Sequence, residues 1–381
     1  MRISRISKVA ILATATVVAL VPSAVAYDVT GTGASSVLNF IDKCKVSYQN
    51  DTKDTFSYTG PGSGDGKTAI NAGTKDIGYS DSVNTAATEG RFHIPAAVWP
   101  ISIAYNLNNS ASKPLQLSID TIAKIFTGKI TRWNDAAIVA DNARVRSIPV
   151  FKVQNGKTVL DANGSPVVEK YRTLTVPFTL PDKPITVIYR TGSSGTTDNF
   201  TQALAAGAST VWTKAGNGTF STANPTDIST LAGTFQGFSG STGVATAAAA
   251  AKYSITYVEG SYVTANPVLK SALVINKAGK TTSPDVPGAQ AMYAASDLNE
   301  ATGIVTWKYA TTAPAAYPFT AATYALVRSN YGDKDKSAAV KRQVEYMAFD
   351  CIKTVTTEPM IAISKTSDLG KAILKLTAKI A

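Results

Sequence analysis

Along most of the chain, short apolar runs of the kind found in buried strands alternate with stretches of helical periodicity. Strands are predicted at residues 101–107, 185–189 and 254–258, and helices at residues 118–126 and 341–354. Strands that alternate with helices in this way are typical of an α/β protein whose strands run mainly parallel. We therefore expect the α/β fold class.

Residues 145–182 break this alternation. Two β-type runs at residues 150–153 and 158–160 flank Asn155-Gly156, and a second such pair follows at Asn163-Gly164. Asn-Gly between β-type runs is the usual composition of a two-residue hairpin turn, because both residues tolerate the left-handed backbone conformation. We therefore expect a β-hairpin insertion near residues 145–182.

The first 26 residues have the pattern of a signal peptide. Arg2, Arg5 and Lys8 precede an apolar run at residues 9–21, and residues 23–26 supply an A-x-A cleavage site. The apolar run has 13 residues, whereas a membrane-spanning helix needs about 20. A signal anchor that stays in the membrane is the alternative. No cysteine directly follows the predicted cleavage point, so we expect an exported protein without a lipid anchor, located in the periplasm, in the cell envelope or outside the cell.

Length and charge narrow the classes of partner. Without residues 1–26 the chain has 355 residues. This is longer than the chains that usually fold around a single hydrophobic core, so two domains are expected. The formal net charge falls from +11 to +8. A net positive charge is compatible with a partner that is nucleic acid, an acidic surface or an anionic ligand. Because the lysines and arginines form no dense stripe with interleaved aromatic residues, we expect no nucleic-acid partner and favour an anion or the anionic cell envelope.

Cys44 and Cys351 are the only cysteines of the chain. A pair of cysteines in an exported protein predicts one disulfide bond. Two separate buried thiols are the alternative that the sequence leaves open.

Three segments rich in glycine and hydroxyl residues each precede a predicted helix. They are residues 31–36 (GTGASS), 62–66 (GSGDG) and 192–196 (GSSGT). A helix N-terminus offers free backbone N–H groups and the positive end of the helix dipole, and both favour an anion. Each segment alone is also an ordinary cap or turn. Three in one chain, one of them just after Arg190, together predict an anion site.

Motifs for catalysis are missing or broken. Residues 60–68 approach a nucleotide P-loop, but that pattern needs glycine at Pro61. His93 is the only histidine and lies between Phe92 and Ile94 in no catalytic context, so it is predicted to be structural. A Ser-His-Asp hydrolase would depend on it, and a zinc site built from one histidine and two distant cysteines is not expected. We therefore expect no catalytic residues, no metal and no cofactor, and favour a binding protein over an enzyme.

Six segments occur in a specific order along the chain. They are residues 31–35 (GTGAS), 62–64 (GSG), 76–81 (DIGYSD), 125–135 (IFTGKITRWND), 190–197 (RTGSSGTT) and 255–259 (ITYVE). In this order they resemble the substrate-binding protein of the bacterial phosphate ABC importer, over most of the chain after residue 26. The resemblance implies a two-lobed, type II periplasmic-binding-protein-like fold, with two α/β lobes joined by a two-segment hinge. It also implies that the protein binds inorganic phosphate in the cleft between the lobes and delivers it to the membrane permease of the importer.

The same resemblance divides the chain into lobes. Lobe 1 is expected to comprise residues 27–104 and 318–381. Lobe 2 is expected to comprise residues 105–317, including the hairpin insertion. The chain would then cross between the lobes near Ala104 and near Tyr317, forming a hinge that closes on the ligand. We expect a monomer.

Eight residues match positions that contact phosphate in this family. They are Ser35, Ser36, Ser63, Asp81, Arg190, Ser194, Gly195 and Thr196, with Ser36 and Gly195 giving backbone N–H groups. The residue types suit the ligand, since Arg190 neutralises charge and can bind two oxygens at once. The hydroxyl side chains donate hydrogen bonds, whereas Asp81 can only accept and so demands a proton on the ligand.

The chain also departs from the family pattern. The family often has a bulky aromatic residue at Ser36 and an acidic residue at Gly192, so the partner that orients Arg190 is missing or replaced here. The Gly/Asn-rich segment before the Ala-rich helix is reduced to residues 240–243, and the hairpin insertion is not typical. Two alternatives to phosphate import stay open: a secreted phosphoryl hydrolase, and a surface protein that binds another oxyanion in the same cleft.

Overall fold

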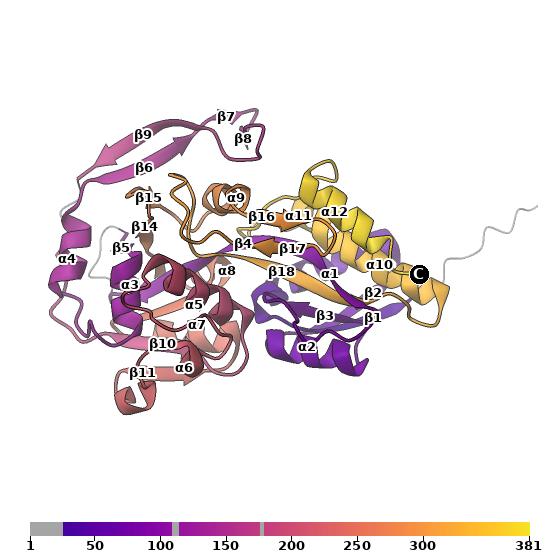
Figure 1. Ribbon diagram of the computed structural model, residues 1–381, viewed down its shortest axis with the longest axis horizontal. Helices are drawn as coiled ribbons and strands as arrows, with labels where there is room; N and C mark the ends of the chain where they lie inside the picture. Colours follow the sequence, from indigo (N-terminus) through magenta and orange to yellow (C-terminus); the bar gives the residue numbers. More distant parts are fainter. Residues whose placement is uncertain (1–25, 109–113, 176–178) are drawn as a thin grey trace, which may run out of the picture.

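The computed structural model describes residues 26–108, 114–175 and 179–381, so the signal peptide predicted at residues 1–26 lies outside the described residues except for Ala26. Figure 1 shows two groups of helices and strands, one built from both ends of the chain and the other from its middle. One mixed β-sheet runs through both groups. Its strands follow the order β11-β10-β12-β4-β18-β3-β1-β2, with β13 paired to β4.

The first group, lobe 1, contains both ends of the described chain. Its strands are β1 (Asp28–Gly33), β2 (Thr55–Thr59), β3 (Ile77–Ser80) and β18 (Thr320–Arg328), and its helices are α1 (Leu38–Thr52), α2 (Ser63–Ala72), α10 (Lys334–Phe349), α11 (Cys351–Thr354) and α12 (Asp368–Thr377). β1 runs parallel to β2 and β3, whereas β18 runs antiparallel to β3. α10 buries Val340, Val344 and Met347, whose spacing gives the helix an apolar face toward the sheet.

The second group, lobe 2, is formed by the middle of the chain. Its part of the sheet contains β10 (Thr186–Arg190), β11 (Phe235–Phe238), β12 (Ser254–Glu259) and β13 (Lys270–Ser271). Its helices are α3 (Ile119–Phe126), α4 (Ala136–Ala143), α5 (Gly195–Gly207), α6 (Phe220–Ala223), α7 (Gly240–Ala250) and α8 (Gly260–Thr264), and a small sheet joins β5 (Gln116–Ser118), β14 (Leu273–Ile275) and β15 (Thr281–Thr282). β10 lies parallel to β11 and β12. The parallel strands with their connecting helices confirm the predicted α/β fold class.

One strand, β4 (Arg91–Asn106), belongs to both lobes. Residues 91–100 pair with β18 and residues 101–106 pair with β12, antiparallel in both cases. The sequence predicted only its second half, because Pro95 and Pro100 argue against a central strand. A register shift between Thr323 and Tyr324 of β18, opposite residues 95–97, accommodates the first proline. A single strand therefore passes from lobe 1 into lobe 2.

The chain returns to lobe 1 through residues 307–319. Just before this return, α9 (Val286–Ala294) and the hairpin of β16 (Asp297–Asn299) and β17 (Ile304–Thr306) pack near β4. Two connections between the lobes agree with the two-segment hinge that the resemblance implies. The boundaries near Ala104 and Tyr317 stay predictions.

Residues 146–174 form a ribbon that stands apart from the main sheet. β6 (Arg146–Phe151) pairs antiparallel with β9 (Val168–Leu174), and β7 (Val153–Gln154) and β8 (Lys157–Thr158) form a short hairpin at the tip. Asn155 and Gly156 have φ angles of 51° and 73°, the left-handed conformation that an Asn-Gly turn requires. Figure 1 shows the ribbon starting near the end of α4 and running back over lobe 2, above β15, with β7 and β8 at its far end.

A disulfide joins the two chain segments that build lobe 1. Cys44 of α1 and Cys351 of α11 are bonded, with their Cα atoms 5.6 Å apart, which confirms the predicted pairing. Close by, the rings of Tyr48 and Tyr346 pack edge to face, with centroids 5.3 Å apart. The bridge therefore fastens the C-terminal helices to the first helix of the same lobe.

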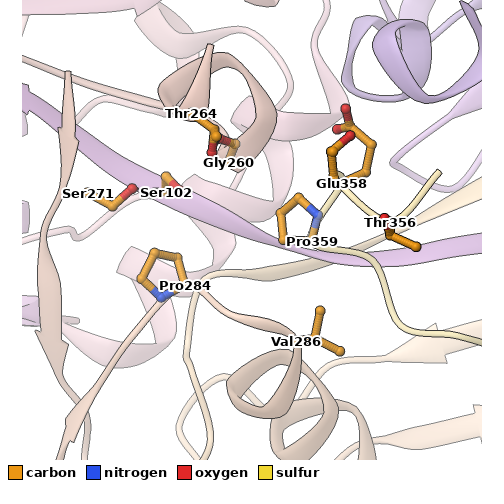
Figure 2. Close-up of a pocket in the computed structure, with 10 residues that line it drawn as sticks. Ser102, Gly260, Thr264, Ser271, Pro284, Val286, Thr356, Glu358 and Pro359 are labelled. Carbon is orange, nitrogen blue, oxygen red and sulfur yellow. Dashed lines mark hydrogen bonds between the residues drawn. The ribbon is translucent and has the colours of Figure 1, made fainter. Parts of the chain in front are cut away.

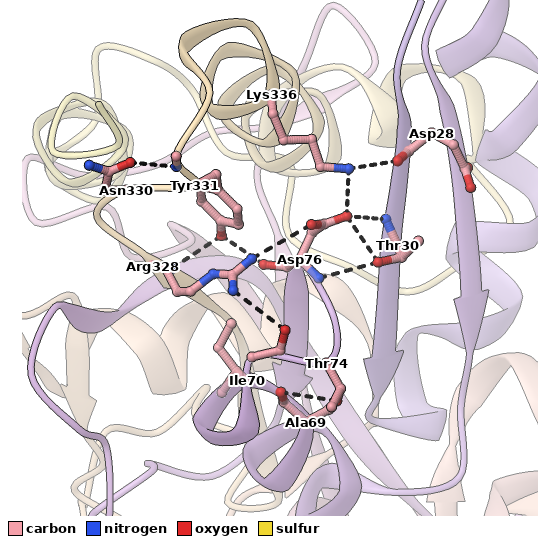
Figure 3. A network of polar contacts seen from close by, with 12 residues as sticks. Asp28, Thr30, Ala69, Ile70, Thr74, Asp76, Arg328, Asn330, Tyr331 and Lys336 are labelled. Carbon is pink, nitrogen blue, oxygen red and sulfur yellow. Dashed lines mark hydrogen bonds and ion pairs between the residues drawn. The ribbon is translucent and has the colours of Figure 1, made fainter.

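A charged network holds the same two segments together (Figure 3). Asp76, just before β3, accepts hydrogen bonds from the backbone N–H of Thr30 at 2.8 Å and from Thr30 Oγ1 at 2.9 Å. Lys336 Nζ lies 2.8 Å from Asp76 Oδ2, and an Arg328 nitrogen lies 3.7 Å from Oδ1. The first aspartate of the segment DIGYSD therefore has a structural role, because it links β1 to β18 and α10.

Candidate functional site

The three Gly/Ser segments occupy the same kind of position, the turn between a strand and a helix. The first spans the end of β1 and the start of the 3-10 helix η1 (Ser35–Val37), ahead of α1. The second follows β2, and Ser63 is the first residue of α2. The third follows β10, and Ser194 is the N-cap of α5. Each turn thus presents the N-terminal end of a helix, as the sequence predicts.

Contacts between the lobes bring these turns together. Arg190 Nη1 donates to Ser35 Oγ at 3.0 Å, and the backbone N–H of Gly64 donates to the carbonyl of Ser193 at 3.2 Å. Within lobe 1, the N–H of Asp81 donates to Ser63 Oγ at 3.1 Å. The eight residues predicted from the sequence are all buried, and they lie together where the two lobes meet, a region that we call the cleft.

Gly195 shows how closely the lobes approach. A Cβ atom at this position would lie 2.6 Å from both Asp81 Cβ and Ser63 Oγ. Real side chains do not tolerate such distances, so only glycine fits here. The approach also lets the first turn of α5 direct its free N–H groups toward residues of lobe 1.

Arg190 is the positive charge of the cleft. It ends β10 and keeps only 3% of its surface exposed. Nη1 contacts Ser35 Oγ and, at 3.4 Å, Ser241 Oγ, while Nε is buried without a hydrogen-bond partner. Within the described residues no carboxylate forms an ion pair with it, so two serine hydroxyls stand where the family pattern expects an acidic partner.

Asp81 is the acceptor of the cleft. Its Oδ1 accepts hydrogen bonds from Ser36 Oγ at 2.7 Å and from Thr323 Oγ1 at 2.6 Å. Burial raises the pKa of Asp81 to about 7, the two hydrogen bonds lower it, and the charges of Glu259 and Arg190 act in opposite directions.

The hydroxyl groups of the cleft differ in whether their own proton is available to a ligand. Ser63 Oγ accepts from the N–H of Asp81, and Ser194 Oγ accepts from the N–H of Thr197 at 3.2 Å. Since each of these two hydroxyls accepts a bond, its own proton is free for a ligand. Thr196 Oγ1 instead donates to Glu259 Oε1 at 2.7 Å.

Several residues of the cleft were missed by sequence reasoning. Ser241 lies at the start of α7, with its Oγ 2.8 Å from Ser35 Oγ. It follows the same pattern of small residues at a helix start, so that pattern could have identified it. Asn199 Nδ2 donates to the carbonyl groups of Asp81 at 2.6 Å and Gly195 at 2.9 Å, and so bridges the lobes. Nothing in the sequence near Asn199 indicates this contact.

His93 lies outside this cluster. Its Nε2 accepts a hydrogen bond from the N–H of Asn84 at 2.8 Å, and its ring packs edge to face on Tyr324. Burial lowers the pKa of His93 to about 4, so the ring is neutral at physiological pH. Its contacts give it a structural role, in agreement with the prediction.

Two hollows lie beside the cleft and do not include the eight residues. The larger, about 630 Å³, is lined from lobe 1 by Gly64 and Lys67 and from lobe 2 by Gly192 and Ser193. The smaller, about 250 Å³, lies where Ser102 of β4 faces the loop at residues 356–359 (Figure 2). The eight residues lie apart from both hollows because, in this closed arrangement, they pack against one another.

Known proteins share both the sequence pattern and the fold. Residues 19–350 match the model of the PBP superfamily domain. Over 303 residues the chain is 31% identical to the Phosphate-binding protein PstS 3 of Mycobacterium tuberculosis (strain ATCC 25618 / H37Rv), covering 75% of this chain and 69% of that protein. Over 318 residues it is 30% identical to the Phosphate-binding protein PstS of Pasteurella multocida (strain Pm70), covering 83% of this chain and 80% of the relative.

A solved structure has the same architecture. The crystal structure of the Phosphate binding protein from Stenotrophomonas maltophilia matches with a TM-score of 0.61 at 18% identity, covering 91% of this chain and 93% of that one. The fold and the matched domain define a PBP superfamily protein. Within that superfamily, the chain belongs to the family of the phosphate-binding proteins PstS. This confirms the resemblance and the two-lobed type II fold predicted from the sequence.

Proposed function

We propose that this protein holds one inorganic phosphate between its lobes and delivers it to the membrane permease of a phosphate ABC importer. The observation that carries the proposal is Arg190, a buried guanidinium with no ion pair in the described part of the chain, set among hydroxyl and N–H donors from both lobes. A buried charge without a counter-charge is costly, and a bound anion supplies one. The names of the PstS relatives support phosphate as that anion.

Each of the eight cleft residues has a role that suits this ligand. Arg190 pairs with phosphate oxygens, Ser63 and Ser194 donate their free protons, and Gly195 and Ser36 donate backbone N–H groups. Ser35, Thr196 and Asp81 complete the set. Asp81 accepts a proton that the ligand carries, which distinguishes phosphate from fully ionised sulfate.

Closure follows from the way the ligands are divided between the lobes. Ser35, Ser63 and Asp81 lie on lobe 1, whereas Arg190 and Ser194 lie on lobe 2. A ligand that contacts both sets favours the closed state, since it interacts more strongly with that state than with an open one. We propose β4 and residues 307–319 as the hinge, which places the lobe boundaries close to Ala104 and Tyr317.

The cellular setting is also part of the proposal. The pattern of residues 1–26 supports export to the periplasm, the envelope or the exterior. We also propose that the protein acts as a monomer. In the described part of the chain, no helix is both long and apolar enough to cross a membrane. We propose a binding role rather than catalysis, because the cleft holds a ligand set and His93 lies outside it.

Calorimetry with inorganic phosphate tests the proposal directly. Wild-type protein, stripped of phosphate by partial unfolding and dialysis, is expected to bind one phosphate per chain. Arg190→Ala removes the charge of the cleft, and losing the partner of a buried charged ligand costs about 2–5 kcal/mol. Affinity should therefore fall at least about thirtyfold.

Arg172→Ala is the matched control, because Arg172 lies exposed on the ribbon, away from the cleft. It should keep wild-type affinity. Wild-type affinity in the Arg190 variant would rule out the assigned site, and a wild-type protein that binds no phosphate would rule out the function.

A further inference from the structure

A second carboxylate lies beside the proposed phosphate ligands. Glu259 is the last residue of β12 and keeps only 4% of its surface exposed. Its Oε1 accepts the hydroxyl hydrogen bond of Thr196 at 2.7 Å, and its Oε2 is buried without a hydrogen-bond partner. A buried carboxylate is costly unless it is paired and hydrogen-bonded, and the hydrogen bond that Glu259 accepts comes from a residue of the proposed anion site.

Titratable and charged groups on three neighbouring elements lie near Glu259. Asp81, at the end of β3, has its pKa raised by burial and further by the charge of Glu259. Tyr262 of α8 faces the same group, and its pKa is raised by burial and then by Glu259. Arg190 of β10 is the cation that acts on both Asp81 and Tyr262. The charges of Glu259 and Arg190 thus act in opposite directions on their neighbours, although no ion pair joins the arginine to either carboxyl group in the described part of the chain.

The hydrogen bond to Glu259 also fixes what Thr196 can do for a ligand. A hydroxyl group has one proton, and Thr196 gives it to Glu259. Its oxygen can then only accept. Ser63 and Ser194, which accept backbone N–H groups, keep their protons for the ligand.

We propose that Glu259 turns Thr196 into a second acceptor beside Asp81, so that the site takes phosphate with two protons, the singly charged dihydrogen form. This inference rests on the proposed phosphate site. Glu259 is a positioning residue, since it acts through the Thr196 hydroxyl. The two ligand protons go to Asp81 and to Thr196 Oγ1, which leaves the remaining phosphate oxygens for the donors.

A defined pH dependence follows. Phosphate loses its second proton near neutral pH, so above this point the complex must take up one proton from solution. The dissociation constant then rises about tenfold per pH unit by linkage. At about pH 8.5, Asp81 of the free protein is largely ionised, because its pKa is about 7, and so it does not supply that proton.

The test is calorimetry with inorganic phosphate from neutral pH to about pH 8.5, in pairs of buffers with different ionisation enthalpies. Wild-type protein should take up close to one proton per phosphate at the upper pH. In Glu259→Gln the amide can donate to Thr196 Oγ1, which frees the hydroxyl proton for the ligand. This variant should take up almost none, and its dissociation constant should not rise over the range.

Two further variants separate positioning from a general structural effect. Thr196→Val removes the acceptor itself and should also abolish the proton uptake, even if Glu259→Gln folds poorly. Glu358→Gln is the control, because Glu358 is equally buried but pairs with Lys43 outside the cleft, and it should keep the wild-type uptake.

The outcomes distinguish this inference from the function on which it rests. Phosphate binding by wild type without proton uptake, or with the same uptake in the Glu259 and Thr196 variants, overturns the role of Glu259 and leaves the phosphate site standing. A wild-type protein that binds no phosphate overturns the site itself.

Discussion

Asp76 and Arg190 are both buried charged residues, and their surroundings differ in one respect. Asp76 has Lys336 and Arg328 as ionic partners and Thr30 as a hydrogen-bond donor. Arg190 has serine hydroxyls, and its Nε is left without a partner. Charges of lobe 1 that hold the chain together are neutralised within the fold. The charge between the lobes is not, which is the condition expected of a site that an anion completes.

The sharpest way to test this difference is to change the acceptor of the cleft. Asp81→Asn replaces a carboxylate with a group that can donate, so sulfate should bind measurably while phosphate weakens modestly. Sites built to pair a substrate hydroxyl reject analogues lacking it by about 10⁴–10⁵, and part of this ratio should be lost. Competition binding of phosphate and sulfate to both proteins measures it.

The gain for sulfate should be partial, because Thr196 would still present an acceptor. Adding Glu259→Gln should therefore improve sulfate binding further. An unchanged phosphate-to-sulfate ratio in Asp81→Asn would show that Asp81 merely supports the turn after β3.

Removing the disulfide tests lobe 1, the other region of this comparison. Replacing Cys44 and Cys351 together with alanine should lower the free energy of unfolding by about 4 kcal/mol, near the upper end of the usual range, because the closed loop is long. Phosphate affinity should stay close to that of wild type, since neither residue lies in the cleft. Denaturant titration of the oxidised wild type and the double variant decides the matter, and equal unfolding free energies would contradict the prediction.

The smallest expected effect concerns the ion pairs themselves. Asp76→Ala should cost about 3 kcal/mol of stability, at the low end for breaking a buried pair, because Lys336 and Arg328 keep 21% and 26% of their side chains exposed. Asp42→Ala is the control, since its pair with Lys45 is exposed and worth at most about 1 kcal/mol. Thermal unfolding with and without phosphate measures both. A large loss of phosphate affinity in Asp76→Ala would remove the distinction drawn between the two regions.

The sequence predicted the parts of the site that depend on local chemistry. Arg190 and Gly195 belong to a continuous segment in which a strand, a turn and a helix start can be recognised. The location of Cys44 and Cys351 on helices of the same lobe also followed from the expected fold. In these cases, neighbouring residues carry the information.

The sequence could not predict partners that tertiary pairing brings in. Thr323 reaches Asp81 because β18 lies antiparallel to β3 in the sheet, and no pattern near Thr323 shows it. The segment ITYVE matched the family, but a sequence does not show that Glu259 points toward Thr196. The first half of β4 was missed because tertiary packing and a register shift outweigh its prolines.

The course of folding is constrained by the strand that both lobes share. β12 precedes β18 in the chain, so the second half of β4 can find its partner before the C-terminal strand and helices of lobe 1 are in place. Pairings between distant segments form slowly, because closing a long loop costs entropy before any contact is gained. Until β18 arrives, the edge of β3 stays open to other strands, a known route to aggregation. We expect the insertion of β18 between β3 and β4, followed by the oxidation of Cys44 and Cys351, to be the last and slowest stage of folding.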